Sequence, residues 1–151
     1  MIEDIAAEKA VVATAIYDPS CAALLNGFVR ASHFYRPILG RMYRYAHDLE
    51  SRHAWERVSE ILTKPEITNE GVMAATDQTL DDLVFNFVQS ESSVEKYGQR
   101  VIEASQKRVY LDALRKAEEQ LLSGGTVHSA AAHVQRVERG LRIRAVREAA
   151  L

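Results

Sequence analysis

The feature that most constrains this chain is a stretch from about residue 90 to residue 122 that contains no proline and a single glycine. Its helical spacing of apolar residues predicts one α-helix, which at 1.5 Å per residue would be roughly 45 Å long. Ser92 and Glu95 match a capping box, so we expect the helix to begin there. Gly124 and Gly125 should end it, because glycine readily adopts the left-handed conformation that closes helices.

A second helix is predicted after the two glycines, and it carries a narrow apolar seam. Thr126 is suited to cap its start. The seam residues are spaced alternately three and four positions apart, as in a coiled coil. Because the connecting loop is very short, the two helices must lie antiparallel. We therefore predict that residues 91–148 form a helical hairpin whose seam contains Val127, Ala130, Val134, Val137 and Leu141.

The apolar surface of this hairpin exceeds what one neighbouring helix covers. The long helix has one apolar set near Tyr97 and a second, shifted set that contains Tyr110, Leu114 and Leu121. A matching hairpin from a second copy is the simplest partner for the free face. The alternative is that the hairpin folds back onto its own chain. We favour self-association, through Tyr97, Val101, Tyr110, Val127, Val134, Val137 and Leu141.

The sequence pattern of residues 1–90 predicts a compact helical head. Apolar residues recur there at helical spacing almost everywhere, and period-two alternation is almost absent. Asp18 and Pro19 suit an N-cap and the first residue of a helix. Three prolines and seven glycines are too few for a sandwich or barrel with many tight turns. The expected fold is all-α, with helices over residues 2–17, from 19 onwards, and over 37–52, 54–62, 69–75 and 79–89.

The composition excludes several kinds of site. Cys21 is the single cysteine, which excludes an internal disulfide and a cysteine zinc site and fits a reducing compartment. The five histidines lack metal-ligand spacing, and the Gly124–Thr126 segment lacks the lysine of a P-loop. No apolar run approaches the roughly 18 residues of a membrane span. We therefore expect no catalytic residue, no cofactor, no metal and no membrane contact.

Two charged clusters have both a structural and a functional interpretation. Glu3, Asp4 and Glu8 fall in a first helical turn, where the helix dipole favours negative charge, so they need no catalytic role. The arginines near the C-terminus are either partners of the helix dipole on a solvated face or contacts for phosphates. We favour the solvated face, because the arginine side chains are expected to radiate around the helix without forming one stripe, and because no aromatic residues for base stacking are interleaved with them. The arginines of this cluster are Arg136, Arg139, Arg142, Arg144 and Arg147.

Three stretches taken together resemble the N-terminal domain of the DnaB family of replicative DNA helicases. The most specific is Phe34-Tyr35-Arg36-Pro37, which is similar to an aromatic–proline helix start in that family. A second is the glutamate-containing stretch at residues 7–12 with the Asp-Pro turn that follows it. The third is the stretch at residues 97–102, which is similar to the start of the family's helical hairpin.

The resemblance implies a non-catalytic all-α domain that pairs through helical hairpins. In that family the domain forms a dimer or a trimer of dimers on a hexameric motor, docks primase or a helicase loader, and meets DNA only indirectly. We therefore expect a cytoplasmic oligomerisation and docking domain of DNA replication, with the ATP-dependent P-loop motor absent from this chain. The alternatives are a free-standing helicase-binding regulator or loader, and a small nucleic-acid-binding protein.

Overall fold

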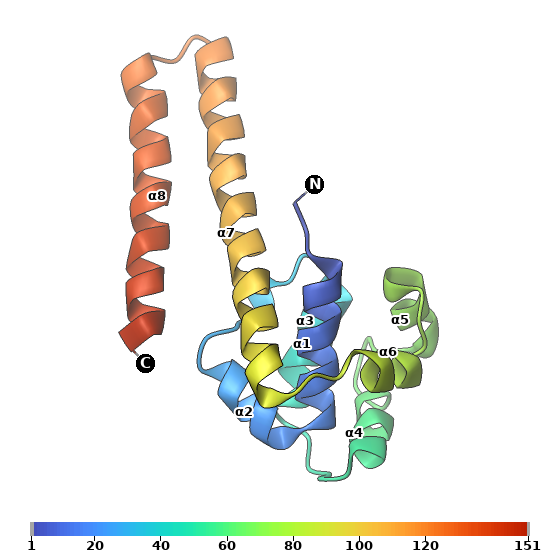
Figure 1. Cartoon of the computed structure of the whole chain (residues 1–151). Coiled ribbons are helices and arrows are strands. Elements are labelled where there is room, and N and C mark those ends of the chain that lie inside the picture. Colours follow the sequence, from blue (N-terminus) through green and yellow to red (C-terminus); the bar gives the residue numbers. More distant parts are fainter. Residues whose placement is uncertain (1, 151) are drawn as a thin grey trace.

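The computed structural model describes residues 2–150, with side chains described for residues 2–143. The regular elements in this part of the chain are helices, which confirms the all-α fold. A compact head is followed by a long hairpin that rises from it (Figure 1). The elements are α1 (Ile5–Tyr17), α2 (Pro19–Asn26), the 3₁₀ turn η1 (Ala31–His33), α3 (Pro37–Ala46), α4 (Ala54–Ile61), α5 (Asn69–Thr76), α6 (Leu80–Phe87), α7 (Glu91–Leu122) and α8 (Val127–Ala150).

The central helix of the head is α1, which contacts α2, α3, α4, α6 and α7. An amphipathic helix at a protein surface usually buries a single apolar face. In α1, burial instead extends around most of the helix and includes the polar residues Glu8 and Thr14. The reason is that small alanines alternate with β-branched residues in this segment, so that neighbouring helices approach from several sides.

Side-chain caps set two of the predicted helix starts. Asp18 accepts a hydrogen bond from the backbone N–H of Ser20 at 2.8 Å, and Pro19 is the first residue of α2. Thr79 accepts one from the backbone N–H of Asp82 at 3.3 Å at the start of α6. These bonds satisfy backbone donors that have no partner within the helix, which confirms the predicted cap at Asp18 and adds one at Thr79.

The predicted N-cap of the long helix was wrong by two residues, although the hairpin begins at residue 91 as predicted. Ser90, and not Ser92, is the N-cap of α7, because its hydroxyl accepts a hydrogen bond from the backbone N–H of Ser93 at 3.3 Å. The proposed capping pair of Ser92 and Glu95 therefore lies inside the helix. Serines at several neighbouring positions offer competing caps, and the spacing alone does not choose between them.

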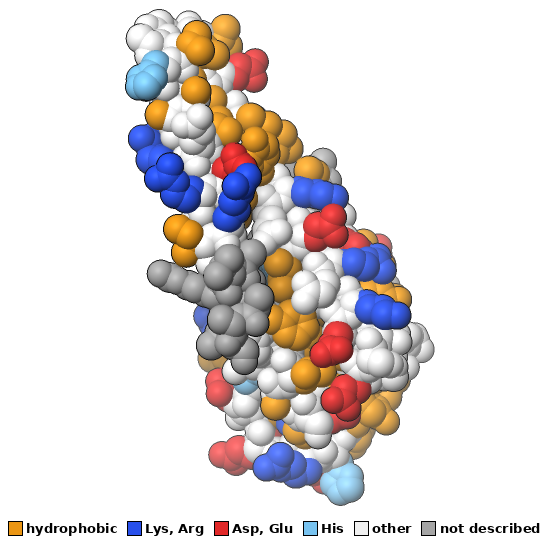
Figure 2. Space-filling view, turned by 60° about the vertical axis from the view of Figure 1, so that its left-hand side comes forward, with side chains coloured by type: hydrophobic (Ala, Val, Ile, Leu, Met, Phe, Trp, Pro, Cys, Tyr) orange, Lys and Arg blue, Asp and Glu red, His pale blue; other side chains and the backbone are white. Residues whose placement is uncertain are grey.

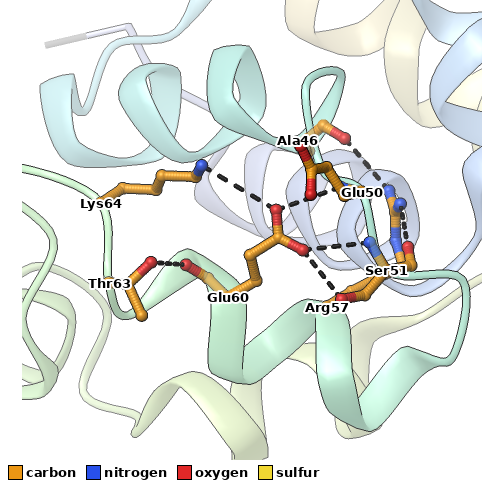
Figure 3. A network of polar contacts seen from close by, with 7 residues as sticks. All are labelled: Ala46, Glu50, Ser51, Arg57, Glu60, Thr63 and Lys64. Carbon is orange, nitrogen blue, oxygen red and sulfur yellow. Dashed lines mark hydrogen bonds and ion pairs between the residues drawn. The ribbon is translucent and has the colours of Figure 1, made fainter.

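The third helix, α3, is shorter than predicted and ends at Ala46. Figure 3 shows the polar network that fixes the segment after it. The Arg57 guanidinium donates to the carbonyl oxygens of Ala46 and Ser51, both at 3.1 Å. The Glu60 carboxylate accepts from the backbone N–H groups of Glu50 and Ser51 at 3.1 and 3.0 Å. These bonds replace the helical hydrogen bonds that the segment would otherwise make.

The head and the hairpin are joined by α7. Its first half packs against α1 and α2, and its second half pairs with α8 (Figure 1). Gly98 is buried where α7 packs against the segment that follows α2, and a Cβ atom there would lie 2.8 Å from the ring of Phe28. Gly124, with φ of 97°, makes the left-handed turn between the two hairpin helices. The predicted antiparallel hairpin is therefore present, with glycine at its turn.

The core of the head extends past residue 90. Val94, Val101 and Ile102 of α7 belong to the same buried cluster as Val12 and Leu25. The first three turns of α7 therefore fold as part of the head. The predicted boundary at residue 90 separates residues that share one core. It marks where the long helix begins in the sequence, and the two sides of it do not pack independently.

Candidate self-association and docking surface

The segment Phe34-Tyr35-Arg36-Pro37 connects η1 to α3 and lies against α1. Phe34 is buried, and Pro37 is the first residue of α3. The carboxylate of Glu8 on α1 accepts hydrogen bonds from the backbone N–H groups of Tyr35 and Arg36 at 3.0 and 3.2 Å. Because one carboxylate binds two adjacent donors, it fixes the start of α3 against α1.

A cation from the long helix also holds this segment. Arg108 of α7 donates hydrogen bonds to the carbonyl oxygens of Ile2 and His33 at 3.1 and 2.8 Å. Its guanidinium lies 5.3 Å from the centroid of the Tyr35 ring. Burial raises the pKa of Glu8, and the two backbone N–H groups and the charge of Arg108 only partly offset that effect. The motif is therefore a junction between α1, α3 and α7.

An apolar groove follows one flank of the hairpin above the head, and we call it the hairpin groove. Leu114 on α7 lines the groove and is 44% exposed, and Leu121, seven residues further along the helix and outside this lining, is 45% exposed. Apolar side chains are visible along the outer part of the hairpin (Figure 2). Glu103 and Lys107 also line the groove and form an ion pair at 3.2 Å. Its apolar lining comprises Ile2, Tyr110, Leu111, Leu114 and Leu141.

The comparison with known families concerns mainly the head. The sequence model of the DnaB-like helicase N-terminal domain matches residues 1–103 of this chain. The chain belongs to this family. Neither the curated proteins nor the solved structures contain a match to it.

The match covers the head of this DnaB-like N-terminal domain and the part of α7 that packs on the head. It includes the Phe34–Pro37 segment and the buried Glu8, so both of these motif regions fall within the family. Most of the hairpin groove lies beyond residue 103, at Lys107, Tyr110, Leu114 and Leu141. The outer hairpin therefore lies outside the residues that the family model matches.

The predicted self-association residues separate into two groups, and the α7 group is partly inside the head. Val101 is 1% exposed and belongs to the core of the head, so it was wrongly assigned to a contact with a second copy. Tyr97 is half-buried against the same core, and the Arg100 guanidinium lies 4.9 Å from its ring centroid. Tyr110, by contrast, is 36% exposed and lines the hairpin groove.

The predicted residues of α8 lie along the seam with α7. Val134, Val137 and Leu141 are half-buried, and Leu141 also lines the hairpin groove. Val127 is 74% exposed at the hairpin tip. Tyr110, Val127 and Leu141 therefore retain surface for a partner, and contact with a second copy stays a prediction for them.

Sequence reasoning missed two parts of the site. Leu114 and Leu121 belong to the shifted apolar set of the long helix, so the signal was present, but they were not assigned to the interface. The acidic cluster was explained by the helix dipole, which fits Asp4, because it caps α1 through the backbone N–H of Ala7 at 3.1 Å. That explanation was wrong for Glu8, whose partners are 27 and 28 residues away in the sequence.

Other groups in the described part of the chain offer less chemistry. Cys21 is buried, and burial together with nearby Asp18 raises the pKa of its thiol to about 11. No three His, Cys, Asp or Glu side chains are placed among the described residues so as to hold a metal. Within residues 2–150 every helix is too short or too polar to cross a membrane.

Proposed function

We propose that this DnaB-like N-terminal domain is a non-catalytic oligomerisation and protein-docking domain of a replicative DNA helicase. The observation that carries the proposal is the hairpin groove, in which large apolar side chains of α7 remain exposed after α8 has packed. Tyr110, Leu114 and Leu121 recur at spacings of four and seven residues, so they lie on one side of α7. Contiguous exposed apolar surface of this kind marks interaction sites.

A second copy of the same hairpin is the occupant that the groove fits best. In a two-fold interface each surface must complement itself. The groove combines an apolar strip with the oppositely charged Glu103 and Lys107. A two-fold axis between these two positions would place Glu103 of each copy beside Lys107 of the other. The ion pair that they form within one chain, both more than half exposed, would then exchange or extend across the interface.

The experiment is sedimentation equilibrium of the whole chain over a range of micromolar concentrations. The wild type is expected to self-associate, and Leu114→Asp is expected to be monomeric, because a buried carboxylate without a partner is strongly unfavourable. Met73→Asp is the matched control, since Met73 is 42% exposed on α5 of the head. A strictly monomeric wild type, or a Leu114→Asp variant that assembles normally, would contradict the proposal.

The docking role rests on family membership and on exposed aromatic residues of the head. Trp55 on α4 is 60% exposed and is the single tryptophan of the chain, and Phe85 on α6 is 44% exposed. Aromatic residues of this kind are enriched in protein interfaces. We propose a primase or a helicase loader as the docked protein. Binding of purified primase to the immobilised chain should weaken on Trp55→Ala and persist on Met73→Ala.

A further inference from the structure

The charges of this chain are distributed unevenly between its parts. Residues 1–90 carry 13 acidic and eight basic residues, whereas α8 carries five arginines and two glutamates. The net charge of −2 therefore combines an acidic head with a basic final helix. A polyanion is attracted by the electric field of a locally basic region, even where the net charge of the whole molecule is negative.

The arginines of α8 were expected to radiate around the helix, but the three whose side chains are described lie on one side of it. Arg136, Arg139 and Arg142 follow one another at intervals of three residues, which at 100° per residue places them within roughly 120° of arc. The seam residues Val134, Val137 and Leu141 are centred on the opposite side. We call the three arginines the arginine ridge. Figure 2 shows basic side chains gathered on one face of the hairpin.

The arginine ridge is exposed and only partly neutralised. All three of its side chains are exposed, and that of Arg142 is 78% exposed. Glu138 forms an ion pair with Arg142, while Arg136 and Arg139 make no ion pair within the described part of the chain. Gln135 and Glu138 line a shallow depression with Arg139 and Arg142, so the ridge has a surface on which a ligand oxygen could rest.

We propose that the arginine ridge binds the phosphate backbone of single-stranded DNA without sequence preference. The ridge presents one guanidinium for about every 4.5 Å of helix axis, which gives a row of positive charges that a flexible strand of phosphates can follow. No aromatic side chain is interleaved with the arginines, so the contact is electrostatic and reads no bases. Arg139 and Arg142 lie away from the apolar seam, whereas Arg136 lies at its edge, where it lines a depression with Val137 and Leu141.

The test is fluorescence anisotropy of a labelled oligothymidylate with the whole chain at increasing salt. Arg136→Gln/Arg139→Gln/Arg142→Gln should weaken binding at low salt by about tenfold or more, and should make the slope of log affinity against log salt shallower by about 2. The matched control removes three exposed cations elsewhere, Arg44→Gln/Arg52→Gln/Lys96→Gln. It has the same net charge as the ridge variant and should bind as the wild type does.

A second variant keeps the proposal testable even if the triple variant folds poorly. Glu138→Gln removes the carboxylate that pairs with Arg142, so it should tighten DNA binding severalfold. The proposal is overturned if the wild type does not bind the oligonucleotide at low salt, or if the control loses as much affinity as the ridge variant. It is also overturned if poly-glutamate of equal charge competes as well as DNA, which would indicate an acidic protein partner instead.

Discussion

The backbone nitrogen of Tyr35 lies 3.0 Å from the carboxylate of Glu8, 27 residues earlier in the chain. This bond and its neighbour at Arg36 attach the start of α3 to the central helix. Glu8 is 1% exposed, so its carboxylate has little access to water and depends on these partners. The most specific sequence motif of this DnaB-like domain is thus held by a residue that the motif does not contain.

Glu8→Gln should destabilise the head by about 1–3 kcal/mol. The amide keeps one acceptor oxygen but turns an NH₂ group towards the second backbone donor, which leaves that donor without a partner. Urea unfolding followed by circular dichroism measures the change. Glu3→Gln is the control, because Glu3 makes only a partly exposed ion pair with Arg36 at 3.5 Å, a contact worth about 1 kcal/mol or less. Equal effects of the two substitutions would contradict the role of Glu8.

Gly98→Ala should destabilise the fold by about 1–3 kcal/mol through overpacking. The added methyl group would meet two ring carbons of Phe28 at 2.8 and 3.1 Å and Cγ2 of Val29 at 3.1 Å. Gly140→Ala on α8 is the contrasting change, since no atom lies within 4 Å of its Cβ position. Alanine there should be neutral or stabilise by up to about 1 kcal/mol. Thermal unfolding of both variants tests the sign of each effect.

The network at Glu60 predicts a pH dependence of stability. Hydrogen bonds from the backbone N–H groups of Ser51 and Glu50 and from the Ser51 hydroxyl lower the pKa of Glu60 from its usual 4.5. A lowered pKa in the folded state means that this contribution is complete above about pH 4.5 and disappears as the pH falls through the folded value. The stability difference between the wild type and Glu60→Gln should therefore be larger at pH 7 than at pH 3.

Glu56→Gln is the control for this pH dependence, because Glu56 is exposed on the same helix. Its unfolding free energy should follow that of the wild type at both pH values. A wild-type advantage over Glu60→Gln that stays the same at pH 3 would show that Glu60 does not stabilise the segment after α3 through its charge.

The sequence determined the helices more fully than it determined their partners. Caps such as Asp18 and the glycines at 124 and 125 act locally, so spacing alone located the turns of the chain. The burial of Val101 and the bonds of Glu8 depend on residues far away in the sequence, and helical periodicity contains no information about them. Periodicity shows which face of α7 is apolar, but not where along the helix the head ends and the free groove begins.

The buried cation Arg57 gives the largest predicted loss of stability. It is 1% exposed, and its guanidinium donates to the carbonyl oxygens of Ala15, Ile16, Ala46 and Ser51. Arg57→Met should destabilise the head by about 3 kcal/mol or more, because several buried carbonyl oxygens lose their donor at once. Arg57→Lys should recover little of the loss, since one ammonium lacks the planar set of donors that reaches α1 and the end of α3 together. Arg52→Met is the control, because Arg52 is a nearby arginine that is exposed. It should change the unfolding free energy by less than about 0.5 kcal/mol in a urea titration.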